Sequence, residues 1–234
     1  QIGEQNSVKV IKVGAGTDAT FSKAFTAESF DLDNDVTISE NGNTIGIGDA
    51  GTINIADSAI VTIDDTVVAT ESVFVTAATD DTAGVAIGTG GHTVLLPSNF
   101  TSGTITYIDG GGQTLTSTMI TDTVVTDTAL TDYTAALANT NVDIAITAAA
   151  KTEATTASEL GVTADVSRSL KQANAAIKAA GNAAGVDAFT NALNAVNGMT
   201  AATDTDLALQ VAPQTDMISG STFAAQAMTG SLQG

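Results

Sequence analysis

A change of hydrophobic period near Thr147 divides this sequence into two parts. Before it, apolar and polar residues alternate, as in residues 142–147 (VDIAIT), and a period of two is typical of strands. From about Ser158 onward, apolar residues recur every three or four positions, which is typical of amphipathic helices. The sequence therefore predicts a β part over residues 1–150 and a helical part over residues 151–234.

The β part contains short runs of Val, Ile and Thr separated by turns of Gly, Asn and Asp. Its apolar anchors Ile38, Ile47, Ile55 and Ile63 lie nine, eight and eight residues apart. Regular short strands with small polar corners indicate a sandwich, a barrel or a parallel β-solenoid (β-helix). The solenoid is favoured because sandwich strands are commonly about five or six residues long. The expected runs are residues 36–38, 44–47, 52–55, 60–63, 66–68, 72–75 and 84–87.

Residues 7–13 (SVKVIKV) alternate Val and Ile with Lys9 and Lys12, which predicts an N-terminal strand. Lysines protect an edge strand from pairing with other sheets, and this is one interpretation of the segment. The other is a strand that pairs with a neighbouring subunit. Three of the seven phenylalanines follow, and we expect them to form a hydrophobic plug at the end of the β part: Phe21, Phe25 and Phe30.

Residues 31–35 (DLDND) place Asp31, Asp33 and Asp35 at alternate positions, as at the start of an EF-hand calcium loop. That motif needs Gly at its sixth position and Glu at its twelfth, where this sequence has Val36 and Gly42. Two interpretations remain: an acidic turn before a strand, or a Ca²⁺ site formed by the three carboxylates. No other cofactor is expected.

Acidic residues outnumber basic ones by 26 to 7, so the formal net charge is -19. A field of this sign repels phosphate groups, and we expect no nucleic-acid partner. No run approaches the roughly 18 apolar residues of a membrane span, so no span is expected in this chain. Cysteine is absent, which excludes disulfides, zinc–thiolate sites and cysteine nucleophiles.

Residues that could support catalysis are sparse. His92 is the only histidine, and we interpret it as a loop residue at the start of a strand. One histidine without cysteine forms neither a specific metal site nor a Ser-His-Asp relay. Solenoid enzymes that act on sugars usually carry basic and aromatic residues beside their carboxylates, whereas this chain has Arg168 as its only arginine and no Trp. We therefore expect that the protein is not an enzyme.

The helical part predicts four helices. The first begins at Ser158 or Thr163 and ends at Gly181, and the second ends at Gly198. Residues 204–211 and 214–232 predict two more, so an Ala-rich helical bundle is expected. The apolar stripe of the first helix consists of Val166, Leu170, Ala173 and Ile177, and that of the second of Val186, Phe189, Leu193 and Val196.

Residues 100–234 combine a strand ending in Ile-Asp, a Gly-rich turn, the element DTALTDYT at 127–134, an Asn-containing turn and an apolar closing strand at 139–147. Ala-rich helical sequence follows, with LQVAP at 209–213. This order resembles the C-terminal end of bacterial autotransporter passengers and their helical linker. The resemblance implies a region that caps a β-helix and assists folding during secretion. Because no barrel sequence follows, we expect that the barrel was removed or that the passenger end is used alone.

A solenoid of about 140 residues would be only roughly 30 Å tall, so it becomes long only by stacking on copies of itself. We therefore expect an extracellular structural protein: a self-assembling subunit of a bacterial surface filament or array, exported with removal of a signal peptide. The alternative is an autotransporter-type passenger fragment acting as an adhesin on a host or neighbouring cell. The expected self-assembly residues are Val8, Val10 and Val13 at one end and Val142, Ile144 and Ile146 at the other.

Overall fold

The computed structural model describes residues 8–14, 19–21, 25–38, 45–63, 72–76 and 84–197. The chain forms two compact units. The first comprises Gln1–Thr126 and Tyr133–Ala149, and the second comprises Asp127–Asp132 and Ala150–Gly234. The short segment Asp127–Asp132 thus belongs with the helical part, although the sequence pattern placed it in the β part.

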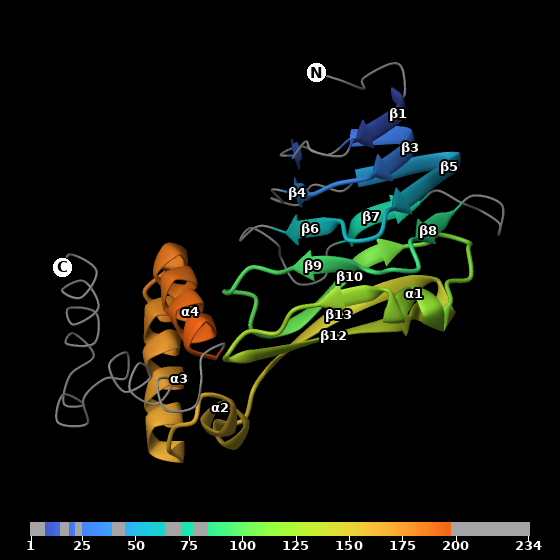
Figure 1. Ribbon diagram of the computed structural model, residues 1–234. Coiled ribbons are helices and arrows are strands. Elements are labelled where there is room, and N and C mark those ends of the chain that lie inside the picture. The colour runs from blue at the N-terminus through green and yellow to red at the C-terminus, as the bar shows by residue number, and fades with distance from the viewer. Residues whose placement is uncertain are drawn as a thin grey trace. The chain divides into compact units, whose positions relative to one another are not determined.

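Two sheets form the described part of the first unit, and the chain alternates between them from β1 to β7 (Figure 1). The larger sheet has the order β1-β3-β5-β7-β10-β13-β12, with β8 paired to β5. The smaller sheet has the order β11-β9-β6-β4-β2, and its pairs are parallel. The strands of the larger sheet are β1 (Val8–Val13), β3 (Phe25–Leu32), β5 (Ile45–Ile55), β7 (Ser72–Thr76), β8 (Val85–Ile87), β10 (Gly103–Asp109), β12 (Thr131–Ala138) and β13 (Asp143–Ala150). Those of the smaller sheet are β2 (Ala19–Phe21), β4 (Val36–Ile38), β6 (Ile60–Ile63), β9 (His92–Leu95) and β11 (Thr123–Val125).

The predicted fold class, a parallel β-solenoid followed by an Ala-rich helical bundle, is wrong. The larger sheet is mixed: β1, β3, β5, β7 and β10 run parallel, but β13 pairs with β10 antiparallel. The described strands also form only two sheets. The physical reason is that alternation of apolar and polar residues specifies which face of a strand is buried but not the direction of its neighbour.

The turn that reverses the chain between β12 and β13 is Asn139–Asn141. All three residues have positive φ, between 48° and 68°. Asn adopts this region more readily than most residues, whereas it is uncommon for the β-branched Thr140. The short helix α1 (Ser117–Thr121) precedes β11, which still pairs parallel with β9, whereas β13 after this turn runs antiparallel to β10.

Strand β5 covers two of the predicted runs in one strand of 11 residues. Its pairing with β3 contains a register shift between Ala27 and Ser29. At that shift the backbones approach closely: a Cβ on Gly51 would lie 1.6 Å from the carbonyl oxygen of Glu28. Only glycine fits there. The predicted run at residues 66–68 lies outside the described residues.

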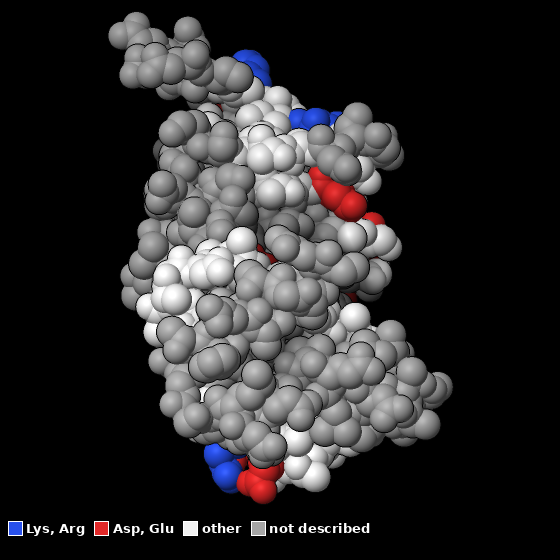
Figure 2. Space-filling model, turned by 90° about the vertical axis from the view of Figure 1, so that its left-hand side faces the viewer, with Lys and Arg blue, Asp and Glu red and all other residues white. Residues whose placement is uncertain are grey.

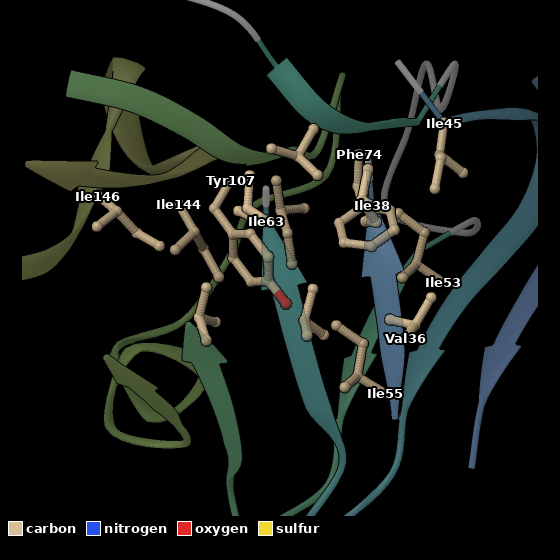
Figure 3. Close-up of a cluster of buried hydrophobic side chains, with 14 of the residues drawn as sticks. Val36, Ile38, Ile45, Ile53, Ile55, Ile63, Phe74, Tyr107, Ile144 and Ile146 are labelled. Atoms are coloured by element: carbon tan, nitrogen blue, oxygen red, sulfur yellow. The ribbon is translucent and has the colours of Figure 1, made fainter. Parts of the chain in front are cut away.

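Apolar side chains from both sheets meet in one core, part of which is drawn in Figure 3. Its largest fully buried side chains include Phe30, Phe74 and Tyr107. An aromatic row runs through this core: Phe30 and Phe74 have ring centroids 5.8 Å apart, and Phe74 and Tyr107 are 5.6 Å apart. At one end, Phe21 and Phe25 contact Phe30, so the predicted clustering of these three phenylalanines is confirmed.

The other end of the aromatic row is His92 of β9, which is only 1% exposed. Its Nε2 lies 2.9 Å from the hydroxyl oxygen of Tyr107, and the two rings stack. Because β9 belongs to the smaller sheet and β10 to the larger, this hydrogen bond joins the two sheets. Burial lowers the pKa of His92 to about 4, and the Asp122 backbone carbonyl partly opposes that change. His92 is thus at the start of a strand, as expected, but it lies in the core and not in a loop.

The second unit contains α2 (Glu153–Glu159), α3 (Ala164–Ala179) and α4 (Ala183–Asn197) within its described residues. The first two begin at N-caps, where the side chains of Thr152 and Thr163 accept hydrogen bonds from backbone N–H groups. Gly181, with φ of 69°, follows α3. The other two predicted helices, at residues 204–211 and 214–232, lie outside the described residues. The buried core of this unit comprises Ala129, Leu130, Leu160, Leu170, Ala173, Phe189 and Leu193.

The segment Asp127–Asp132 is held in the second unit by polar contacts as well as by that core. Ala129 donates its N–H to Asn194 at 2.7 Å, and Lys151 donates its N–H to the Leu130 carbonyl at 2.9 Å. The side chain of Lys151 is 4% exposed and its Nζ lies 2.6 Å from a Glu159 carboxylate oxygen. A buried ammonium group is costly unless paired, so this contact stabilises the position of Lys151.

Candidate assembly edge

Strand β1 is the first strand of the larger sheet, and its only paired side faces β3. Within the described part of the chain, no strand pairs with its other side. The smaller sheet ends at β2, which among the described strands pairs with β4 alone. Phe21 of β2 contacts Phe25 and Phe30 of β3, so this end of the smaller sheet lies beside the β1 end of the larger one. Both sheets therefore end together near the N-terminal strand, with backbone groups that a further strand could bond.

The side chains of β1 differ in their environment. Val13 is 4% exposed and belongs to the core, whereas Val10 is 55% exposed, the largest value among the described large apolar side chains. Val8 and Ile11 lie between these extremes, and Ile11 packs against the core. Of the three valines expected to mediate assembly, Val10 therefore presents its side chain outward, and Val13 stabilises the subunit itself.

Apolar side chains at this end are incompletely covered by the described residues. Ile11, Ala19, Phe21 and Phe25 are only partly buried, although all four pack against the core. The core residues of interior strands are covered on both sides: Ile53 and Phe74, for example, have no exposed surface. The end of the two sheets thus combines open backbone positions with apolar surface.

The acidic segment lies beside this edge, but its carboxylates do not converge. Asp31 accepts a hydrogen bond from the Asn54 side chain at 2.5 Å, Asp33 pairs with Lys12 at 2.5 Å, and Asp35 accepts from the backbone N–H of Ile60 at 3.1 Å. Among the described residues, no three His, Asp or Glu side chains are grouped so that they could hold a metal ion. The described geometry of Asp31, Asp33 and Asp35 does not fit a calcium site.

Asp33 instead modifies the charge of the edge strand. Its hydrogen bond and its negative charge raise the pKa of Lys12. A second hydrogen bond joins the acidic segment to β1, because the backbone N–H of Asp33 donates to the Val13 carbonyl at 2.9 Å. The positive charge of Lys12 is therefore partly compensated by Asp33 within the subunit. The other basic residue of β1 is Lys9, which is exposed.

The second set of expected assembly residues lies at the opposite end of the larger sheet. Ile144 and Ile146 are fully buried in β13, opposite Ile108 and Ile105 of β10. Val142 is half-buried just before that strand. Among the described strands β12 lies beyond β13 and is the terminal one, so these residues do not form the edge of the sheet, and their expected role in assembly stays a prediction.

Strand β12 is thus the second open edge of the larger sheet within the described residues. Its outer positions Thr134 and Ala136 are exposed, and Tyr133 is buried, with its hydroxyl donating to the Phe100 carbonyl at 3.1 Å. The strand contains one acidic residue, Asp132, and no basic one. Sequence reasoning missed this edge, although the Asn-rich turn at Asn139–Asn141 is a signal for a hairpin that returns beside β13.

Charged side chains of the described residues form small separate groups on the face shown in Figure 2. None of the described helices is long and apolar enough to cross a membrane. Comparison of the chain with protein-family models, curated proteins and solved structures finds no match. The resemblance to autotransporter passengers stays a prediction.

Proposed function

We propose that the protein is an extracellular structural subunit that assembles with copies of itself into a filament or array at a bacterial surface. The observation that carries this proposal is the shared end of the two sheets at β1 and β2, where no described strand covers the backbone edges. Partly exposed apolar side chains lie at the same end. A second copy that adds strands there would satisfy the edges and cover these side chains.

The energetics favour such an addition over an open end. Each backbone hydrogen bond contributes only about 1 kcal/mol net, but a strand of six residues such as β1 can form several of them. Removal of apolar surface from water contributes roughly 25 cal/mol per Å². These terms repeat at every subunit contact, so an assembly built in this way can grow without a new type of contact.

The lysines of β1 can be interpreted as protection against pairing, since Lys on an edge opposes the approach of another sheet. The charge of the whole chain argues against that interpretation. A second copy carries the same net charge of -19, so its overall field attracts positive groups. Lys9 therefore attracts a second copy more than it repels it and reduces the electrostatic cost of bringing two acidic subunits together, whereas Lys12 contributes less because Asp33 pairs with it.

A matched pair of substitutions tests the proposal. Val10→Glu adds a negative charge to the open edge, whereas Leu95→Glu adds the same charge to another exposed apolar position, 37% exposed, on β9, which is paired on both sides. We expect light scattering to show concentration-dependent particles for the unchanged protein and for Leu95→Glu, and far fewer for Val10→Glu. Circular dichroism checks that both variants fold.

Two results would overturn the proposal. One is a monomeric unchanged protein at all concentrations, with and without calcium in the buffer. The other is assembly of Val10→Glu that equals that of Leu95→Glu. A monomer that binds cells or glycans would instead support the adhesin alternative.

A further inference from the structure

We propose that assembly is head-to-tail: the β1 edge of one copy pairs in parallel with the β12 edge of the next. This inference rests on the proposed self-assembly and adds which surface of the second copy is used. Within the described residues the order of the larger sheet ends at β1 on one side and at β12 on the other, while the three-residue strand β8 lies off this order and pairs with β5. Joining β1 to β12 would continue one sheet from subunit to subunit.

Strand direction supports this pairing. β1 runs parallel to β3, and the parallel order continues through β5 and β7 to β10. β13 then runs antiparallel to β10, and the three-residue turn Asn139–Asn141 joins it to β12, which therefore runs in the direction of β10. A second copy related by translation along the sheet would thus present β12 parallel to β1, in keeping with the parallel pairs of the subunit.

Charge favours the same choice. β1 carries Lys9 and Lys12 and no acidic residue, whereas β12 carries Asp132 and no basic residue. Within each copy Lys12 pairs with Asp33, and Asp132 lies 3.5 Å from the Nζ of Lys151, so Lys9 supplies most of the attraction. The competing arrangement is a two-fold dimer in which two β1 strands pair antiparallel. If that pairing is centred between Val10 and Ile11, each Lys9 lies opposite a Lys12, and like charges directly opposite are destabilising.

The symmetry of the contact then determines the product. Two different edges form a heterologous contact, which leaves a free β1 edge and a free β12 edge after every addition. Such a contact generates an open filament unless rotation between subunits closes a ring. Pairing of β1 with β1 would instead stop at a dimer, so the two arrangements differ in what they build.

The absence of cysteine allows a direct test by cross-linking. Val10→Cys places a thiol on β1, and Ala136→Cys places one at an exposed position of β12. The two variants are prepared with different isotope labels, mixed in equal amounts under assembly conditions and treated with a short bis-maleimide. Leu95→Cys, mixed with Val10→Cys, is the control for random collision.

We expect the Val10–Ala136 product to exceed both the Val10–Val10 product and the Leu95 control. Excess Val10–Val10 product would overturn the head-to-tail contact while leaving self-assembly intact. Cross-linking no higher than the control, in samples that scatter light as particles, would do the same. Monomeric samples would overturn the proposed function itself.

A charge reversal gives an independent readout. Lys9→Glu brings a carboxylate towards Asp132 of the next copy, so the concentration at which particles form should rise by about fivefold or more. Lys178→Glu makes the same change in net charge at an exposed position of α3, and it should leave that concentration nearly unchanged. Equal effects of the two variants would contradict the β1–β12 contact.

Discussion

Acidification should destabilise the first unit through its single histidine. In the folded chain the pKa of His92 is about 4, well below its ordinary value of 6.5, because the buried ring is costly to charge. The unfolded chain therefore binds a proton at a higher pH than the folded chain does. The stabilising contribution is complete above about pH 6.5 and is lost as the pH falls towards about 4.

The size of this contribution follows from the same pKa. Each tenfold change in a protonation equilibrium corresponds to about 1.4 kcal/mol, so a fall from 6.5 to about 4 amounts to about 3 kcal/mol. The geometry agrees with burial as the cause, because the His92 ring is only 1% exposed and its Nε2 lies 2.9 Å from the hydroxyl oxygen of the buried Tyr107. A loss of 3 kcal/mol is a large fraction of the stability of a typical domain.

Carboxylates also titrate at acidic pH, so the histidine must be isolated by comparison. His92→Gln keeps an amide that can bond to the Tyr107 hydroxyl but does not titrate. Urea unfolding of both proteins should show that, between about pH 7.5 and pH 4, the free energy of unfolding of the unchanged protein falls by about 3 kcal/mol more than that of the variant. NMR titration gives the pKa directly, since one histidine yields one unambiguous imidazole signal. A parallel loss of stability in the two proteins, or an NMR pKa near 6.5, would refute the reasoning.

Two further substitutions test local features of the fold. Gly51→Ala forces a methyl group against the Glu28 carbonyl, so thermal unfolding should show that the free energy of unfolding falls by at least about 2 kcal/mol. The control is Gly14→Ala, which should have little effect on contacts because nothing lies within 4 Å of its added Cβ. Equal losses of stability in the two variants would contradict the close approach at Gly51. Thr163→Ala removes the side chain that accepts the Val166 N–H at the start of α3 and should cost about 1 kcal/mol, and unchanged unfolding of the second unit would show that this cap does not stabilise the helix.

Periodicity predicted the positions of the elements better than their arrangement. Strands β4 and β6 match the runs at residues 36–38 and 60–63, and α3 begins after the cap Thr163 and ends before Gly181, as its sequence indicates. These features depend on side chains within a few residues of each other. Strand direction does not, which is why the antiparallel pairing of β13 with β10 was not predicted.

At the candidate assembly edge, too, the local structure was predictable and the long-range contacts were not. That β1 would be a strand was predictable from its alternation, but its place at the end of a sheet depends on pairing across the chain. The separation of Asp31, Asp33 and Asp35 follows from contacts with Asn54, Lys12 and Ile60, which lie far from them in the sequence. His92 reaches Tyr107 only because their strands belong to facing sheets, so no local pattern could reveal that bond.

Electron microscopy of the purified chain at high concentration, combined with its mass in solution, tests the central claim most directly. The account predicts concentration-dependent particles that extend in one direction, because each added copy leaves a free β1 edge and a free β12 edge. Uniform single subunits in the images, with a monomer mass at every concentration, would contradict it.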